Sequence, residues 1–127
     1  MVKKKALYKC DLCGNVVESL WNGAGSVLVC CGQPMKELEA GVVEASKEKH
    51  IPAVERVGNT VKVKVGSVAH PMTPEHYILF VEVVAGETVL RKDFVEGDTV
   101  AEAEFVVDAA TPIVVRAYCN LHGLWAA

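Results

Sequence analysis

The cysteines and histidines of this chain form two groups, and each group has the composition of a metal site. The first group is four cysteines near the start of the chain: Cys10, Cys13, Cys30 and Cys31. The second group combines the four histidines with the one remaining cysteine: His50, His70, His76, Cys119 and His122. Because no cysteine or histidine is left over, the sequence predicts an all-thiolate site followed by a separate site of four imidazoles and one thiolate.

The first group has the spacing C-x2-C-x16-C-C. Four thiolates suit tetrahedral iron or zinc, and the spacing alone does not choose between these metals. The adjacent pair, Cys30 and Cys31, is unusual for a zinc ribbon, because neighbouring thiolates reach one metal only with distorted angles. We favour iron, which four thiolates can hold in its oxidised and reduced forms without ligand exchange. The alternatives are a structural zinc site and a set of buried thiols.

The second group carries the chemistry. Five protein ligands exceed what a structural zinc site needs, and a single thiolate among imidazoles indicates a metal chosen for redox chemistry. Such a set leaves one position open on a six-coordinate metal. A thiolate opposite that position donates electron density to whatever binds there, as in thiolate-ligated haems. The pattern therefore predicts a site that reduces a small oxygen species.

Composition limits the class of protein and the kinds of partner. The chain has 127 residues, 51% of them hydrophobic, and a mean hydropathy of +0.26, which indicates a folded globular protein. Its net charge of −3 predicts no nucleic-acid partner and no anionic membrane. No segment resembles a signal peptide or reaches the roughly 20 apolar residues of a membrane span. We expect a cytoplasmic protein, in which clustered cysteines bind metal instead of forming disulfides.

The elements that position these ligands divide the chain into two predicted domains, residues 1–37 and 38–127. The first is too small to bury a stable core by itself, so a metal must hold it together. Within it, we expect residues 16–17 and 27–29 to pair as a hairpin across a glycine-rich turn. Residues 38–47 are expected to be a connector.

From residue 54 onward, hydrophobic side chains recur at every second position, the period of a β-strand. The predicted strands are residues 61–65, 76–84, 88–94, 101–107 and 113–118, of which the second and third form a hairpin. This pattern is typical of an antiparallel β-sandwich, and we expect an immunoglobulin-like layout. The histidines then lie at strand ends and in loops, where such scaffolds usually carry ligands.

The motifs C-x2-C-x16-C-C, E-K-H-x-P, H-P-M-T-P-E-H and C-N-x-H resemble, in this order and over essentially the whole chain, those of desulfoferrodoxin, the two-iron form of superoxide reductase. The resemblance implies that the four N-terminal cysteines bind a rubredoxin-like iron in a desulforedoxin-like domain. It also implies that the four histidines surround a catalytic ferrous iron in its equatorial plane, with Cys119 as the axial ligand.

The resemblance further implies how the second site works. Lys49 would stand near the open face of the iron, and Glu48 would supply a carboxylate to the oxidised metal. Superoxide would take one electron and leave as hydrogen peroxide, without formation of dioxygen, and an outside donor such as rubredoxin would reduce the iron again. A homodimer and an anaerobic or microaerophilic cytoplasm are also implied. From the residues alone, the alternative is that Lys49 is an ordinary solvated lysine.

Two other classes of protein use similar residues. A blue-copper electron carrier also places a cysteine and a histidine on the last loop of a β-sandwich, but its sites take two histidines, one thiolate and often a methionine. No methionine follows His122, and two histidines would have no role. A structural or metal-storage protein would not need five ligands that leave a reactive position. We expect Met72, Trp21 and Trp125 to be packing residues.

Overall fold

The structure is a computed structural model, and it describes residues 2–25, 27–42 and 49–127. The chain divides into two compact units, an N-terminal unit of Met1–Glu39 and a C-terminal unit of Ala40–Ala127. Every regular element in the described residues is a β-strand, and the strands pair antiparallel within their sheets, which confirms the predicted all-β fold class. None of these residues forms a helix with the length and hydropathy of a membrane span.

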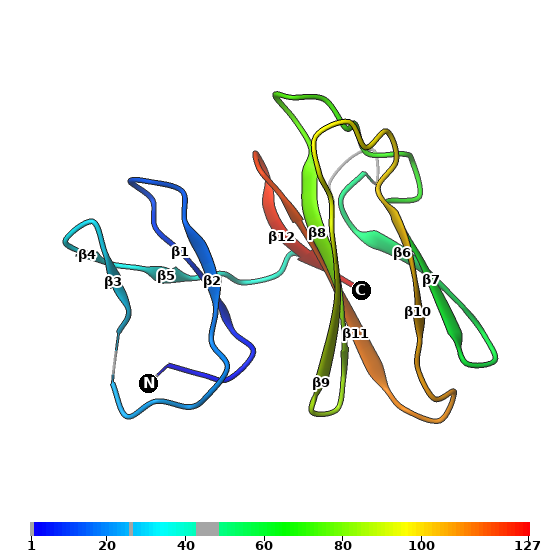
Figure 1. The fold of residues 1–127 in the computed structure, drawn as a ribbon, viewed down its shortest axis with the longest axis horizontal. Helices are drawn as coiled ribbons and strands as arrows, with labels where there is room; N and C mark the ends of the chain where they lie inside the picture. The colour runs from blue at the N-terminus through cyan, green and yellow to red at the C-terminus, as the bar shows by residue number, and fades with distance from the viewer. Residues whose placement is uncertain (1, 26, 43–48) are drawn as a thin grey trace. The chain divides into compact units, whose positions relative to one another are not determined.

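Figure 1 labels the strands along the chain. The strands of the N-terminal unit are short: β1 (Leu7–Lys9), β2 (Val16–Glu18), β3 (Val29–Cys30), β4 (Gln33–Pro34) and β5 (Lys36–Glu37). Those of the C-terminal unit are longer: β6 (Pro52–Val57), β7 (Thr60–Val65), β8 (Ile78–Ala85), β9 (Thr88–Asp93), β10 (Glu102–Val106), β11 (Ile113–Cys119) and β12 (Gly123–Ala126).

The N-terminal unit pairs its strands differently from our expectation. We predicted that residues 16–17 would pair with residues 27–29, and this prediction is wrong. β2 pairs with β1, and β3 pairs with β4, in each case across a short turn that carries cysteines. Closing a short loop costs less chain entropy than closing a long one, which favours these local pairs. β5 then adds to the free edge of β1.

The C-terminal unit is a β-sandwich, as predicted. One sheet has the strand order β10-β7-β6 and the other β12-β11-β8-β9, and Figure 1 shows them face to face. The alternation is clearest in β7, where Val61, Val63 and Val65 are buried and the lysines between them are exposed. The buried side chains that form the core are Val61, Val63, Val65, Ile78, Val81, Val83, Ala101, Val107, Val115, Ala117 and Cys119.

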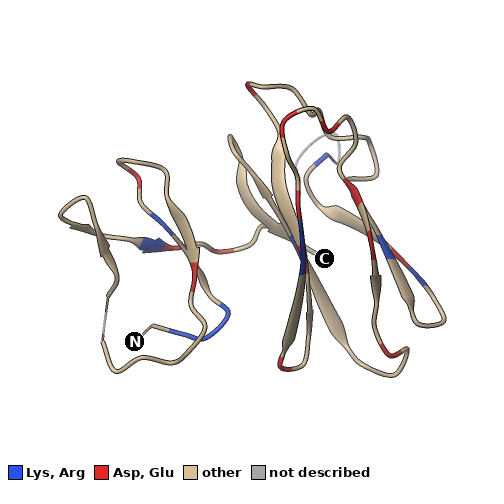
Figure 2. Ribbon diagram, in the orientation of Figure 1, with Lys and Arg blue, Asp and Glu red and all other residues tan. Residues whose placement is uncertain are grey.

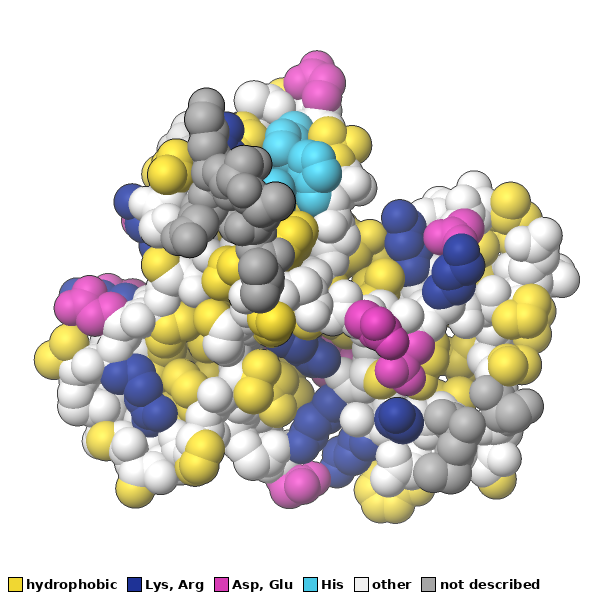
Figure 3. Space-filling model, turned by 180° about the vertical axis from the view of Figure 1, so that it is seen from behind, with side chains coloured by type: hydrophobic (Ala, Val, Ile, Leu, Met, Phe, Trp, Pro, Cys, Tyr) yellow, Lys and Arg dark blue, Asp and Glu magenta, His cyan; other side chains and the backbone are white. Residues whose placement is uncertain are grey.

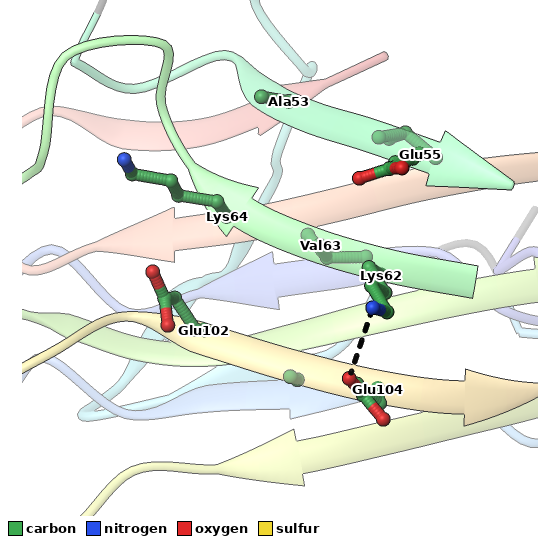
Figure 4. A pocket seen from close by; sticks show the side chains of 9 residues that line it. Ala53, Glu55, Lys62, Val63, Lys64, Glu102 and Glu104 are labelled. Carbon is green, nitrogen blue, oxygen red and sulfur yellow. Dashed lines mark ion pairs between the residues drawn. The ribbon is translucent and has the colours of Figure 1, made fainter. Parts of the chain in front are cut away.

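The outer face of the β10-β7-β6 sheet is covered by charged pairs. Lys62 lies opposite Glu104, with 3.8 Å between the charged atoms, and Lys64 lies opposite Glu102 in the strand register (Figure 4). Charges of both signs follow these strands in Figure 2. Exposed pairs of this kind add little stability. They do help to fix the register, because a slip by one residue would bury the lysines and expose the valines between them.

The other sheet carries a buried ion pair on its central strands. Glu82 on β8 is completely buried, and its carboxylate accepts a hydrogen bond of 2.8 Å from Arg116 on the neighbouring β11. Arg91 on β9 lies 3.8 Å from the same carboxylate. Removing one partner of such a pair would leave a buried charge uncompensated, which typically costs about 3–5 kcal/mol. The pair therefore ties together the strands whose ends carry the second metal site.

Candidate metal centres

The four N-terminal cysteines converge on one point as free thiols. Their sulfur atoms all lie within 4.8 Å of one another. The Sγ atom of Cys30 lies 3.5 Å from that of Cys13 and 4.0 Å from that of Cys31. Four sulfurs at about 2.3 Å from a tetrahedral metal would be about 3.8 Å apart. The thiol arrangement therefore fits one tetrahedral metal ion.

Backbone turns make this convergence possible. Gly14, with φ of 80°, donates to the carbonyl of Cys10 at 2.9 Å and closes a tight turn between the first two cysteines. In the second turn, Cys31 has φ of 53° and the following Gly32 has φ of 73°. The left-handed conformation costs a non-glycine residue about 1 kcal/mol or more. This strained backbone is how two adjacent cysteines direct their sulfur atoms to one centre.

The protonation of these thiols also points to a cation. Hydrogen bonding from the backbone amide of Cys13 is the largest cause that lowers the pKa of Cys10, to about 7. The neighbouring thiols of Cys13 and Cys10 are the main causes that raise the pKa of Cys31 to about 12. Four crowded thiols cannot all ionise unless a positive charge compensates them, and a bound metal supplies that charge.

The ligands of the second predicted site come from separate places in the C-terminal unit. His50 precedes β6, His70 and His76 lie in the connection between β7 and β8, Cys119 ends β11, and His122 lies in the turn before β12. Histidine side chains gather at one place on the surface in Figure 3. All five residues are thus at strand ends or in loops, as we expected.

The donor atoms of this group lie at metal-ligand spacing. One donor atom each from His50, His76, Cys119 and His122 lies within 4.8 Å of the others. His50 Nε2 is 3.0 Å from His122 Nδ1, which in turn is 3.7 Å from Cys119 Sγ. Metal bonds to nitrogen and sulfur are about 2.0–2.3 Å long, so atoms bound to one ion are at most about 4.6 Å apart. The spacing fits a single ion.

His70 completes the group. Its ring centroid lies 4.5 Å from that of His76 and 4.9 Å from that of His50. His70 Nδ1 lies 2.7 Å from the carbonyl oxygen of Pro71, which can only accept, so Nδ1 carries the proton and Nε2 keeps a free lone pair. That Nε2 is buried without a hydrogen-bond partner in the described residues. A metal ion would satisfy it, with the carbonyl fixing the tautomer from behind.

Burial prepares these groups for a metal. It is the main cause that lowers the pKa of His70 to about 4 and also the main cause that lowers the pKa of His76, so both imidazoles are neutral at pH 7. Burial likewise raises the pKa of Cys119, which is 0% exposed, although hydrogen bonds from the backbone amides of Leu121 and His122 lower it in part. A cation would reverse this shift, since a coordinating thiol is deprotonated.

Asn120 fastens two parts of the site together, a role that sequence reasoning did not assign. Its Oδ1 accepts from the Tyr77 amide and its Nδ2 donates to the Glu75 carbonyl, both at 2.9 Å. Its own amide donates to the Tyr77 carbonyl at 3.1 Å. The residue after one ligand, Cys119, therefore holds both neighbours of another, His76. The C-N-x-H motif contained Asn120, but only the fold shows what the side chain contacts.

The two predicted non-ligand residues of the site differ in what can be said of them. Lys49 is half-buried, and its positive charge is one of the causes that lower the pKa of His76, after burial and the charges of His122 and His50. Glu48, the predicted carboxylate ligand, lies outside the described residues.

Comparison with known proteins agrees with this geometry. The sequence model of the family described as Desulfoferrodoxin matches residues 42–127, and the model of the desulfoferrodoxin N-terminal domain matches residues 2–38. The chain belongs to the desulfoferrodoxin family. It is 50% identical over 125 residues to a desulfoferrodoxin homolog from Methanothermobacter thermautotrophicus, and the alignment covers 98% of this chain and 99% of that one.

Solved structures extend the comparison to the fold. The superoxide reductase from Treponema pallidum matches with a TM-score of 0.77 and 34% identity over 96% of both chains. A one-iron superoxide reductase from Giardia intestinalis matches 64% of this chain and 96% of its own length, with a TM-score of 0.57 and 33% identity. The desulfoferrodoxin family carries two iron centres, and the two ligand groups of this chain provide a site for each. A blue-copper site is not favoured.

Proposed function

We propose that this chain is a superoxide reductase, an enzyme that reduces superoxide to hydrogen peroxide by one electron. One observation carries the proposal: donor atoms of three imidazoles and one fully buried thiol lie within 4.8 Å of one another in the C-terminal unit, and the ring of a fourth imidazole, His70, lies 4.5 Å from that of His76. The similarity to the Treponema pallidum enzyme, which extends over nearly all of both chains, supports it. We assign the ligands as His50, His70, His76, Cys119 and His122.

Iron bound by these residues would supply the electron that superoxide takes. The protein determines how that metal is held: the histidines offer neutral nitrogen donors, and burial keeps the imidazoles of His70 and His76 neutral at pH 7. Cys119 would contribute the one negative charge. Its thiolate, in a position without solvent exposure, would donate electron density to the metal and stabilise the oxidised state.

Lys49 would attract the substrate. Superoxide is an anion and the chain has a net charge of −3, so attraction has to come from a local positive charge. The influence of Lys49 on the pKa of His76 supports its position within electrostatic reach of the histidines. Reduction consumes one electron and two protons per superoxide, and the protons come from solvent. We propose Glu48 as the carboxylate that binds the oxidised iron.

The N-terminal part would hold the other iron through Cys10, Cys13, Cys30 and Cys31. We propose a domain boundary that separates residues 1–37 from residues 38–127, and the separate family matches to residues 2–38 and 42–127 support it. The family acts with a redox donor. For this chain we propose rubredoxin or a similar protein as that donor, a homodimeric assembly and a cytoplasmic location.

An optical spectrum with metal analysis, followed by reaction with superoxide, tests the function. We expect two irons per chain, ferric-thiolate absorption from two distinct sites, and one hydrogen peroxide with no dioxygen for each superoxide consumed by the reduced protein. A single intense copper-thiolate band would instead indicate an electron carrier, and a colourless zinc protein a structural role. Dioxygen released together with peroxide would indicate a dismutase, and each of these three results would overturn the proposal.

A further inference from the structure

Trp125 contacts two of the histidines assigned as ligands. Its indole ring stacks on the imidazole of His50, with 5.1 Å between ring centroids and 21° between the planes. Its Nε1–H donates a hydrogen bond of 3.1 Å to the carbonyl of His122. These two ligands are separated by more than half of the chain, yet one side chain touches both.

The strand position of Trp125 is fixed by a glycine. Gly41 forms a parallel bridge with Trp125: its amide donates to the Leu124 carbonyl and its carbonyl accepts from the Ala126 amide, both at 2.9 Å. A Cβ atom added at Gly41 would lie 2.8 Å from two carbons of the indole ring, closer than real Cβ contacts allow. The indole can therefore lie in its present position only if residue 41 has no side chain.

These contacts act on two ligands whose donor atoms lie close together. His50 Nε2 and His122 Nδ1 are only 3.0 Å apart, and a rotation of either ring would move its donor atom away from a shared ion. A flat indole packed against the His50 ring restricts that rotation. The hydrogen bond to the His122 carbonyl holds the turn from which the second imidazole projects.

We propose that Trp125 is a positioning residue of the second metal site, and that Gly41 is the glycine that makes its position possible. The indole orients the imidazole of His50 and holds the turn of His122. The inference rests on the ligand assignment of the proposed function, but not on superoxide as the substrate. It gives Trp125 a role beyond the packing that the sequence suggested.

Three variants separate the contacts. Trp125→Leu removes both the stack and the hydrogen bond, Trp125→Phe keeps an aromatic ring but loses the donor, and Gly41→Ala keeps the tryptophan but displaces it. Trp21→Phe is the matched control, because Trp21 is the other tryptophan of the chain, belongs to the N-terminal unit and is 72% exposed. Outer-shell partners of metal ligands typically contribute about 10- to 100-fold to metal affinity.

The measurements are the affinity of the second site for ferrous iron, by competition with a chelator, and the ferric-thiolate absorption and EPR spectrum of that site. We expect Trp125→Leu and Gly41→Ala to weaken the affinity for iron about 10- to 100-fold and to change the spectrum. Trp125→Phe should lose less of this affinity, and Trp21→Phe should match the wild type in both measurements. In the double variant Gly41→Ala/Trp125→Phe, the loss of iron affinity should be no larger than the sum of the losses in the two single variants, since a smaller ring relieves the clash.

Wild-type affinity and spectrum in both Trp125→Phe and Gly41→Ala would overturn the proposal, even if Trp125→Leu does not fold. So would a loss of thermal stability in the metal-free variants with no change in affinity or spectrum, because that is the effect of packing alone. A wild-type protein that binds iron at this site but does not reduce superoxide would refute the proposed function instead, and would leave these comparisons valid.

Discussion

The side chain of Asn120 provides a direct test of how the fold holds the second site. Its two hydrogen bonds, each 2.9 Å long, go to the backbone of Glu75 and Tyr77, the residues on either side of His76. Asn120→Ala removes both bonds, while the backbone bond from residue 120 to Tyr77 remains possible. The segment that carries one ligand would then be less firmly attached to the loop that carries Cys119.

The expected loss follows from the number of bonds. A typical hydrogen bond contributes about 0.5–1.5 kcal/mol net, so two bonds contribute about 1–3 kcal/mol. If that free energy is lost from the metal-bound arrangement, affinity for iron falls about 5- to 150-fold. Asn120→Asp is nearly isosteric and is still able to accept from the Tyr77 amide. Its second oxygen would face the Glu75 carbonyl, however, so acceptor would meet acceptor and the loss should exceed that of a single bond.

The assay is chelator competition for iron at the second site, read from its ferric-thiolate absorption. Asn59→Ala is the matched control, because Asn59 Oδ1 accepts from the Ala109 amide at 3.0 Å in the same unit but is not one of the residues that contact the ligands. It should lower stability without changing iron affinity. Wild-type affinity in Asn120→Ala, or an equal loss of affinity in Asn59→Ala, would refute this account of the site.

Four further predictions concern other groups. Lys49→Ala should slow superoxide reduction roughly 3- to 100-fold and flatten its salt dependence in stopped-flow experiments, since a charge about 6 Å from the anion contributes about 0.7–2.8 kcal/mol. Cys119→Ser should abolish the ferric-thiolate band of the second site and most activity; full activity with the band intact would mean that the sulfur is not a ligand. Cys13→Ser should disturb the first iron, yet single-turnover reduction by pre-reduced protein should stay nearly unchanged. The metal-free protein should lose stability in denaturant titrations as pH falls from about 6.5 to 4, because the unfolded chain binds a proton at His70 that the folded chain excludes.

The sequence predicted both ligand groups because their chemistry leaves little choice. Cysteine and histidine are the residue types that bind transition metals most readily, and in this chain every one of them belongs to a group. The sandwich was also predictable, since residues 61–65 alternate strictly between valine and lysine, and the valines are buried. Local pattern and tertiary environment agree there.

Other features depend on contacts that no local pattern records. The strands of the N-terminal unit are two or three residues long, too short for hydrophobic periodicity to specify their partners, so the pairing of residues 16–17 was predicted wrongly. The roles of Asn120 and Trp125 come from hydrogen bonds to backbone groups that only the fold brings close. Glutamate usually lies on the surface, yet Glu82 is fully buried, and its charge partners are two arginines on neighbouring strands.

The burial of the second site changes from one ligand to the next, and this difference suits the proposed reaction. Cys119 is 0% exposed and His70 is 4% exposed, whereas His122 is exposed and Lys49 is half-buried. The thiolate would therefore act from a region of low dielectric, where its charge interacts strongly with a metal and where oxidants have little access to the sulfur. The exposed side is where a small anion, the protons that it requires and the peroxide product must pass. A site buried on all sides would protect the thiolate but exclude the substrate. A fully exposed site would admit the substrate, but water would weaken the interaction between the thiolate charge and the metal. It would also leave the sulfur open to the peroxide that the reaction produces.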